Sequence, residues 1–301
     1  MKKTNIKNGF LSYANKLIAT LRGMGRHRMA ERYGSSVNSF KRFIGEKDVS
    51  LVKITPRIIS AYEYYLQGTG VCPNTISFYM RCLRAIYNRA VSEGLITQRY
   101  PFVQVYTGVS KTKKRALPVE TIRDIRNIDL SDLPHIAFAR DMFMFSFYTR
   151  GMSFVDMCYL RKDNLRDGVL TYRRRKTGQL LFVRWEKPMQ DIVDRYDTAG
   201  TPYLLPLIRS SVEDPYKQYK RRQHTVYVNL RRLGDILGLP TPLTTYVARH
   251  AWASIARESD VSLSVISEAM GHDSEKTTRI YLASLNMKHI DSANSLIIGL
   301  L

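Results

Sequence analysis

The chain has 301 residues, and its 47 Lys and Arg outnumber its 26 Asp and Glu to give a formal net charge of +21. This excess favours a polyanionic partner and is spread along the chain, with a balance of +12 in residues 1–108 and +9 in residues 109–301. No run of about 18 apolar residues exists, which argues against a membrane span, and the basic N-terminus lacks the apolar core of a secretory signal. The three cysteines show no paired or metal-ligand spacing, so we expect reduced thiols, no metal site and a cytoplasmic location.

The first hundred residues are predicted to be helical. Apolar residues recur there at three- and four-residue spacing in four segments. These segments are Phe10–Leu21, Tyr33–Phe43, Ile58–Leu66 and Ile76–Ala90. Asn74 is a candidate N-cap of the fourth helix. Arg81 and Arg84 fall on the outer face of that helix, where they are candidate DNA contacts.

Residues 109–118 interrupt the helical periodicity and are predicted to be a linker between two domains, 1–108 and 119–301. The linker carries four basic residues, Lys111, Lys113, Lys114 and Arg115. Two interpretations stay open at this point. These side chains are either solvated, or they cross DNA phosphates and add affinity without sequence information.

The second domain is predicted to be mainly helical, with one β-hairpin. Val169–Arg173 and Leu180–Trp185 read as short strands on either side of a turn that contains Lys176 and Gly178. Helices are expected again from near Pro188 and across later segments, namely 214–237, 246–258, 263–270 and 275–285. The predicted fold class is therefore mainly α with a small β-hairpin or sheet, in two domains.

Four groups in this second domain suggest a common chemistry. They are Arg249 with His250, His272 after a glycine, Tyr281 nine residues beyond His272, and Lys176 in the hairpin turn. Cleavage of a phosphodiester without a metal needs a nucleophile, positive charge near the non-bridging oxygens, and an acid for the leaving 5′ oxygen. Tyrosine, arginine with histidine, and lysine have the chemistry for these roles.

In type, order and spacing, these residues resemble the catalytic domain of the tyrosine recombinase (phage integrase) family. That family's usual pattern is an arginine in Gly-Leu-Arg-x-x-Glu, a hairpin lysine, His-x-x-Arg-His, Leu-Gly-His and a tyrosine nine residues later. The resemblance covers most of residues 110–285, and residues 1–108 resemble the family's helical core-binding (SAM-like) domain in helix count and placement. It implies a site-specific recombinase that needs no cofactor and works on double-stranded DNA, as a homotetramer on two sites.

The resemblance also implies a role for each site residue. Tyr281 would attack the scissile phosphate and form a 3′-phosphotyrosyl intermediate. Arg249, Arg150 and His272 would offset the charge that develops on the phosphate, and Lys176 would protonate the leaving oxygen. The neighbours of Lys176 are expected to be solvated; they are Arg173, Arg174 and Arg175.

The first family arginine is missing from this chain. Gly151 aligns with the family glycine and Asp156 with its acidic residue, so that Ser153 occupies the arginine position. Arg150 lies three residues earlier, and side chains at that spacing are neighbours on a helix. We therefore expect Arg150 to replace the missing guanidinium.

A second departure is Tyr246, at the position where the family usually has histidine. A phenol with an ordinary pKa near 10 is a poor base at neutral pH, so Tyr246 is expected to hydrogen-bond the phosphate at most. His250 either supports the site or belongs to the core.

Three other functions remain possible from the sequence. A type IB topoisomerase would use the same nucleophile and cations without a particular site. A DNA-binding protein that has lost catalysis fits the departures at Ser153 and Tyr246. A basic membrane-surface protein fits the net charge alone. The DNA target, the outcome of recombination and any accessory proteins are not predicted.

Overall fold

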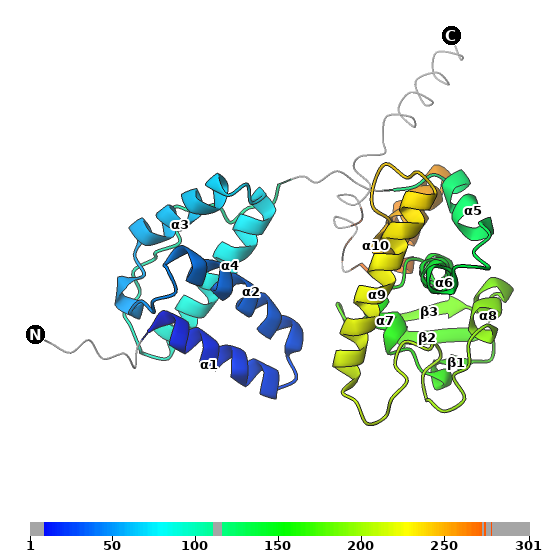
Figure 1. Ribbon diagram of the computed structural model, residues 1–301, viewed down its shortest axis with the longest axis horizontal. Helices are drawn as coiled ribbons and strands as arrows, with labels where there is room; N and C mark the ends of the chain where they lie inside the picture. The colour runs from blue at the N-terminus through cyan, green and yellow to red at the C-terminus, as the bar shows by residue number, and fades with distance from the viewer. Residues whose placement is uncertain (1–8, 111–115, 273, 275–277, 279–301) are drawn as a thin grey trace, which may run out of the picture. The chain divides into compact units, whose positions relative to one another are not determined.

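The computed structural model describes residues 9–110 and 116–272, together with Ser274 and Thr278. The chain divides into two compact units, Met1–Thr112 and Lys113–Leu301, whose helices and strands are labelled in Figure 1. Within the described residues, no helix combines the length and apolar character that a membrane span requires.

Residues 9–110 of the first unit form four α-helices and one short 3-10 helix around an apolar core. In chain order they are α1 (Phe10–Gly23), α2 (His27–Phe43), η2 (Leu51–Lys53), α3 (Pro56–Gly68) and α4 (Pro73–Ser92). Helix α2 packs against α1 and α4, and the fully buried side chains of Phe10, Phe40 and Tyr62 lie between the helices. The Tyr62 hydroxyl donates to Ser39 Oγ at 2.7 Å, which satisfies a polar group in this core.

Local polar contacts set where these helices begin. The carboxylate of Asp48 accepts from the backbone N–H groups of Leu11 and Ser12, at 2.8 and 3.0 Å, and so caps α1 from a distant segment. The prediction that Asn74 caps the fourth helix is wrong, because the helix begins at Pro73 and Cys72 is its N-cap, two residues earlier. The Asn74 amide instead bonds both the N–H and the carbonyl of Ser110, at 2.8 and 2.9 Å.

The second unit is a helical domain with one small sheet, as expected. Its helices are α5 (Val119–Asn127), α6 (Pro134–Tyr148), α7 (Phe154–Cys158), η3 (Lys162–Asn164), α8 (Lys187–Asp194), α9 (Pro215–Ile236), α10 (Thr245–Glu258) and α11 (Leu263–Ala269). Helix α6 contacts α5, α8, α9 and α10, and Figure 1 shows it end-on among these neighbours. Most of its side chains are buried, which agrees with its nearly continuous apolar sequence.

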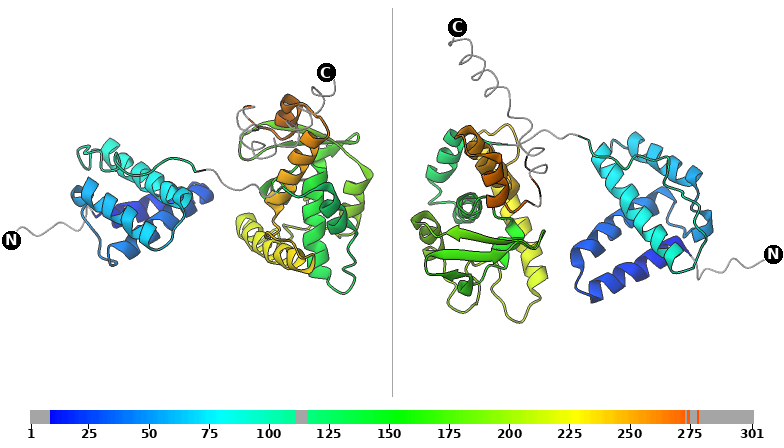
Figure 2. Two further views of the ribbon diagram at one scale, coloured as in Figure 1. Left: turned by 90° about the horizontal axis from the view of Figure 1, so that it is seen from above. Right: turned by 180° about the vertical axis from the view of Figure 1, so that it is seen from behind.

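The predicted hairpin is confirmed and is part of a three-stranded antiparallel sheet, whose strands are drawn as arrows in Figure 2. Strands β2 (Val169–Arg173) and β3 (Leu180–Arg184) pair in a register that sets Arg173 opposite Leu180, and β1 (Leu165–Arg166) pairs with β2. Along β2, Leu170 and Tyr172 point inward while Val169 and Arg173 are exposed. The strand therefore follows the two-residue period of a half-buried sheet.

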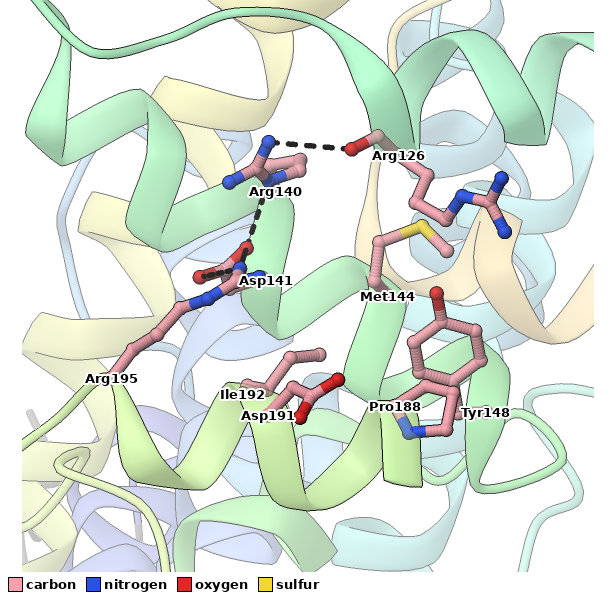
Figure 3. A pocket seen from close by; sticks show the side chains of 9 residues that line it. All are labelled: Arg126, Arg140, Asp141, Met144, Tyr148, Pro188, Asp191, Ile192 and Arg195. Atoms are coloured by element: carbon pink, nitrogen blue, oxygen red, sulfur yellow. Dashed lines mark hydrogen bonds and ion pairs between the residues drawn. The ribbon is translucent and has the colours of Figure 1, made fainter. Parts of the chain in front are cut away.

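A buried carboxylate on α6 forms an ion pair with Arg195, the residue that follows α8. Asp141 is 2% exposed and accepts from Arg140 Nε at 2.8 Å, from Arg195 Nη1 at 2.9 Å and from the Tyr196 hydroxyl at 2.8 Å. Figure 3 shows both guanidinium groups converging on this carboxylate at the edge of a pocket. None of the residues that line this pocket is a predicted site residue, so we assign the cluster a structural role.

Candidate active site

Arg249 lies on α10 and connects three parts of the second unit. Its side chain is 5% exposed. Nη1 donates to the Gly151 carbonyl at 2.9 Å, and Nη2 donates to the Met270 carbonyl at 2.6 Å. The first carbonyl belongs to the turn after α6 and the second to the end of α11. The guanidinium is therefore held where these segments meet.

The turn after α6 approaches α10 so closely that it requires a glycine. Gly151 has a φ of 77°, and a Cβ built there would lie 2.6 Å from Arg249 Cα. The preceding residue, Arg150, also has a positive φ, 60°, which is uncommon for a residue with a side chain. This backbone brings the segment that carries Arg150 next to Arg249.

The helical argument that linked Arg150 to the Ser153 position is wrong. Arg150 belongs to the turn, whereas Ser153 is the N-cap of α7, with its hydroxyl donating to Asp156 Oδ2 at 2.6 Å. The two residues therefore do not lie on one helix, and the proximity of Arg150 to the site comes from the turn.

Charges from several segments converge on Tyr172, a buried residue of β2. Burial, followed by the negative charge of Asp156, raises the pKa of Tyr172 well above its ordinary value. The positive charges of Arg249, Arg174 and Arg150 oppose that rise, in this order of size. The three arginines thus act on one small region of the domain.

Asp156 joins α7 to the hairpin turn. Its side chain is buried, with Oδ2 occupied by Ser153 Oγ and Oδ1 accepting from the backbone N–H of Arg175 at 2.9 Å. Because Lys176 is the next residue, this carboxylate holds the turn that carries the candidate acid. The structure therefore gives Asp156 a positioning role.

The hairpin turn also contacts the segment that contains His272. Gln179 Nε2 donates to the His272 carbonyl at 3.2 Å. A Cβ on Gly271 would lie 3.0 Å from both Gln179 Oε1 and Leu181 Cδ1. Lys176 itself is exposed in this turn. The close packing brings Lys176 and His272 to the same side of the domain.

Arg174 is a buried residue next to the candidate site that the sequence analysis did not single out. The expectation that it is solvated is wrong, because it is 6% exposed and its Nη1 donates to the Gly271 carbonyl. The alternation that buries Leu170 and Tyr172 continues one step past the strand and turns Arg174 inward. The same alternation leaves Arg173 and Arg175 exposed, so the strand pattern contained the signal.

His272 lies among these positive charges. Its Nδ1 is 2.7 Å from Thr278 Oγ1. Burial, followed by the charges of Arg249, Arg174 and Lys176, lowers the pKa of His272 to about 4. The imidazole is therefore neutral at neutral pH and offers a hydrogen bond rather than a full charge.

The first two turns of α10 carry the two supporting candidates. The rings of Tyr246 and His250 meet edge to face, with centroids 4.6 Å apart. Tyr246 is 59% exposed, whereas His250 is buried. This contact gives His250 a packing role beside Arg249 and leaves the Tyr246 ring at the surface.

Several predicted residues lie outside the part of the chain that the structure describes. They are Tyr281, Lys111, Lys113, Lys114 and Arg115. In the first unit, Arg81 and Arg84 are exposed on α4, as expected. Over the described ranges 9–110 and 116–272, no cluster of three or more His, Cys, Asp or Glu side chains suits a metal ion.

Comparison with known proteins identifies both units. Residues 9–105 match the phage integrase SAM-like domain, and residues 134–288 match the phage integrase family. Tyrosine recombinase XerD of Pseudomonas putida is 24% identical over 254 residues, which are 83% of this chain and 84% of that protein. Tyrosine recombinase XerA of Pyrococcus furiosus is 23% identical over 234 residues, 76% of each.

Solved structures share the fold at low identity. The XerH site-specific recombinase in a post-cleavage complex with palindromic difH substrate matches with a TM-score of 0.67 and 16% identity, over 95% of this chain and 84% of that one. A lambda integrase tetramer bound to a Holliday junction matches with a TM-score of 0.66 and 16% identity, over 92% and 78%. Because the phage integrase model matches just over half of the chain, the protein belongs to this family of tyrosine recombinases and is a site-specific DNA recombinase.

Proposed function

We propose that the protein breaks and rejoins DNA strands through an ester on Tyr281. The phenolic oxygen gives its proton to water and bonds to the scissile phosphorus, while the bond from phosphorus to the 5′ oxygen breaks and that oxygen takes a proton from Lys176. The 5′ hydroxyl of another strand then reverses these steps. The convergence of Arg249, His272 and the Lys176 turn from separate elements carries this proposal.

Arg249 and His272 have distinct roles in this mechanism. Arg249 offsets negative charge on the non-bridging oxygens, helped by Arg150 from the adjoining turn. In a neutral imidazole one nitrogen accepts and the other donates. His272 Nδ1 and Thr278 Oγ1 are 2.7 Å apart, and in the tautomer in which the hydroxyl donates to Nδ1, the Nε2–H of His272 is the donor to a phosphate oxygen. Asp156 positions the turn, and Tyr246 contacts the DNA backbone at most.

The partner in this proposal is double-stranded DNA. A net charge of +21, spread over both halves of the chain, supports binding to phosphates. Residues 1–108 act as the core-binding domain, 109–118 as the linker and 119–301 as the catalytic domain. The lambda integrase neighbour is a tetramer on a Holliday junction, and we propose a homotetramer on two DNA sites for this chain. It would act in the cytoplasm, on nucleoid DNA.

Trapping the ester tests the nucleophile. The protein is incubated with genomic DNA of its source, DNA that stays attached in detergent is sequenced, and the mapped site is rebuilt as a nicked duplex that cannot be religated. We expect the wild-type chain to form a covalent adduct on this duplex and Tyr281→Phe to form none while binding it equally well. Tyr64→Phe removes a different exposed phenol and serves as the control.

Two outcomes contradict the proposal. Adducts that persist in Tyr281→Phe would show that another residue attacks the phosphate. A wild-type chain that binds DNA and never forms the adduct would make the protein a DNA-binding protein without catalysis, in keeping with its departures at Ser153 and Tyr246.

A further inference from the structure

We propose that Arg174 supplies the second guanidinium for the scissile phosphate, in place of the family arginine whose position Ser153 occupies. The inference rests on the proposed function and adds a catalytic residue to it. Ser153 cannot act in that role, because its short side chain caps α7 and bonds Asp156. A guanidinium in that role therefore has to come from another part of the chain, and the hairpin carries a buried one at Arg174.

Arg174 and Arg249 bind neighbouring backbone groups. Arg249 donates to the carbonyl of Met270, and Arg174 donates to the carbonyl of Gly271, the next residue along the chain. Both guanidinium groups therefore bind backbone carbonyls at the C-terminal end of α11. His272 follows immediately, so both arginines flank the residue that is proposed to donate to the phosphate.

The electrostatic effects agree with this placement. The charges of Arg249, Arg174 and Lys176 all act on His272, with Arg174 ranking second among them. Arg150, in contrast, acts on Tyr172 together with Arg249 and Arg174. Arg174 therefore acts on the same groups as the proposed catalytic residues: on His272 together with Arg249 and Lys176, and on Tyr172 together with Arg249 and Arg150.

The environment of Arg174 suits an anion. Burying a guanidinium is costly unless an opposite charge compensates it. None of the ion pairs found among the described residues includes Arg174, and the bond to Gly271 engages one of its five N–H donors. A carbonyl at a helix C-terminus supplies only a partial negative charge. A phosphate would complete the compensation, and a planar guanidinium matches its oxygens.

The neighbouring arginines provide a matched control. Arg173 has the same charge, lies in the same hairpin and donates to the Gly178 carbonyl at 2.5 Å, but it is exposed. Arg173→Ala thus removes one charge and one side-chain bond to a carbonyl from the opposite face of the hairpin. A difference in reaction rate between the Arg174 and Arg173 variants therefore reflects the inward orientation of Arg174, because both variants lose the same charge.

The test measures the rate of adduct formation on the nicked duplex. We expect Arg174→Ala and Arg174→Gln to slow the wild-type reaction by about 100-fold or more, since loss of a group that stabilises the transition state usually costs 100- to 1,000-fold. Arg173→Ala is expected to stay within about threefold of wild type. Arg174→Gln retains a donor for Gly271, so it keeps the local fold if the alanine variant loses it.

A second substrate separates catalysis from positioning. It carries a methylphosphonate at the scissile position, where a methyl group replaces one charged oxygen. If Arg174 offsets that charge, the deficit of Arg174→Gln relative to wild type shrinks by about tenfold or more on this substrate. A residue that only holds Gly271 in place would leave the deficit unchanged, and this outcome overturns the proposal.

Arg150→Ala, measured in parallel, compares the two arginines. A large deficit in Arg150→Ala that the neutral substrate relieves, with normal rates in Arg174→Gln, assigns the charge to Arg150 and overturns the inference. Both of these failures leave wild-type adducts on Tyr281 intact. A wild-type chain without adducts is the different result that overturns the proposed function itself.

Discussion

At the scale of single residues, the candidate site is a concentration of positive charge around one neutral imidazole. Arg249, Arg174 and Lys176 all lower the pKa of His272, after the larger effect of burial. This arrangement leaves the site with two guanidinium groups and one hydrogen-bonding ring at neutral pH. The negative charge of a bound phosphate would raise the pKa of His272 again, because it favours the protonated ring.

The lowered pKa of His272 predicts a loss of stability in acid. Between about pH 6.5 and pH 4, the unfolded chain binds a proton at His272 that the folded chain does not. The free energy of unfolding is therefore not reduced by His272 above about pH 6.5, and it decreases as the pH drops toward 4. Allowing for solvent screening of a half-buried group, we expect the wild type to lose about 1–2 kcal/mol more than His272→Gln between pH 7 and pH 4.5.

Urea denaturation of both proteins across this pH range gives the free energies of unfolding. The difference between the two curves isolates His272, because all other titrating groups are shared. If the free energies of unfolding of the two proteins changed equally with pH, the folded protein would not lower the pKa of His272.

At the scale of secondary-structure elements, the site depends on how close the α6–α7 turn comes to α10. The carbonyl of Gly151 accepts from Arg249, and its Cα faces the Arg249 backbone with no room for a methyl group. Asp156 on α7 then holds the hairpin turn through the N–H of Arg175. Three elements are thereby aligned by backbone contacts rather than by apolar packing alone.

Gly151→Ala is expected to destabilise the protein and to reduce cleavage. The substitution strains a backbone with a φ of 77° and brings Cβ within 2.6 Å of Arg249 Cα, so we expect a loss of about 2–4 kcal/mol. Gly178→Ala has the same φ of 77° with nothing within 4 Å, and it should lose only the strain, about 1 kcal/mol.

Chemical denaturation of both variants measures this contrast, and adduct formation on the nicked duplex reports the position of Arg249. Equal destabilisation by the two substitutions would mean that the turn moves away from α10 at little cost. In that case the close approach would not hold Arg249 in place.

At the scale of the whole molecule, positive charge is distributed over both compact units and over the segment between them. The first 108 residues have a balance of +12 and the remainder has +9. Recombination requires the protein to stay on DNA while strands exchange. Electrostatic affinity that does not depend on sequence serves this purpose.

The linker residues are expected to add to this affinity. Replacing Lys111, Lys113, Lys114 and Arg115 with alanine should flatten the dependence of log K on log salt by about 3–4, since each phosphate contact contributes about 0.9. Fluorescence anisotropy with a labelled duplex at several salt concentrations measures the slope. In the control, Arg184→Ala with Lys187→Ala removes basic residues that pair with Glu186 and Asp191. An unchanged slope in the linker variant would mean that the linker is only a solvated connection.

Sequence patterns predicted the local structure and the class of chemistry. Helical spacing predicted the four helices of the first unit, and alternation with a glycine turn predicted the hairpin of β2 and β3. The motifs around Arg249, His272 and Tyr281 indicated phosphoryl transfer to a tyrosine. The helices and the hairpin could be read because each depends on residues close together in the chain, where periodicity and turn chemistry act, whereas the chemistry was indicated by residue types and by the resemblance to a known family.

Tertiary structure decided how the site is assembled. Arg174 meets Gly271 across 97 positions of sequence, and Arg249 meets Gly151 across 98. The inward orientation of Arg174, the capping role of Ser153 and the lowered pKa of His272 all follow from such packing. A local pattern does not specify which distant carbonyl a guanidinium will reach or how much water it will lose, because both depend on how separate elements fold together.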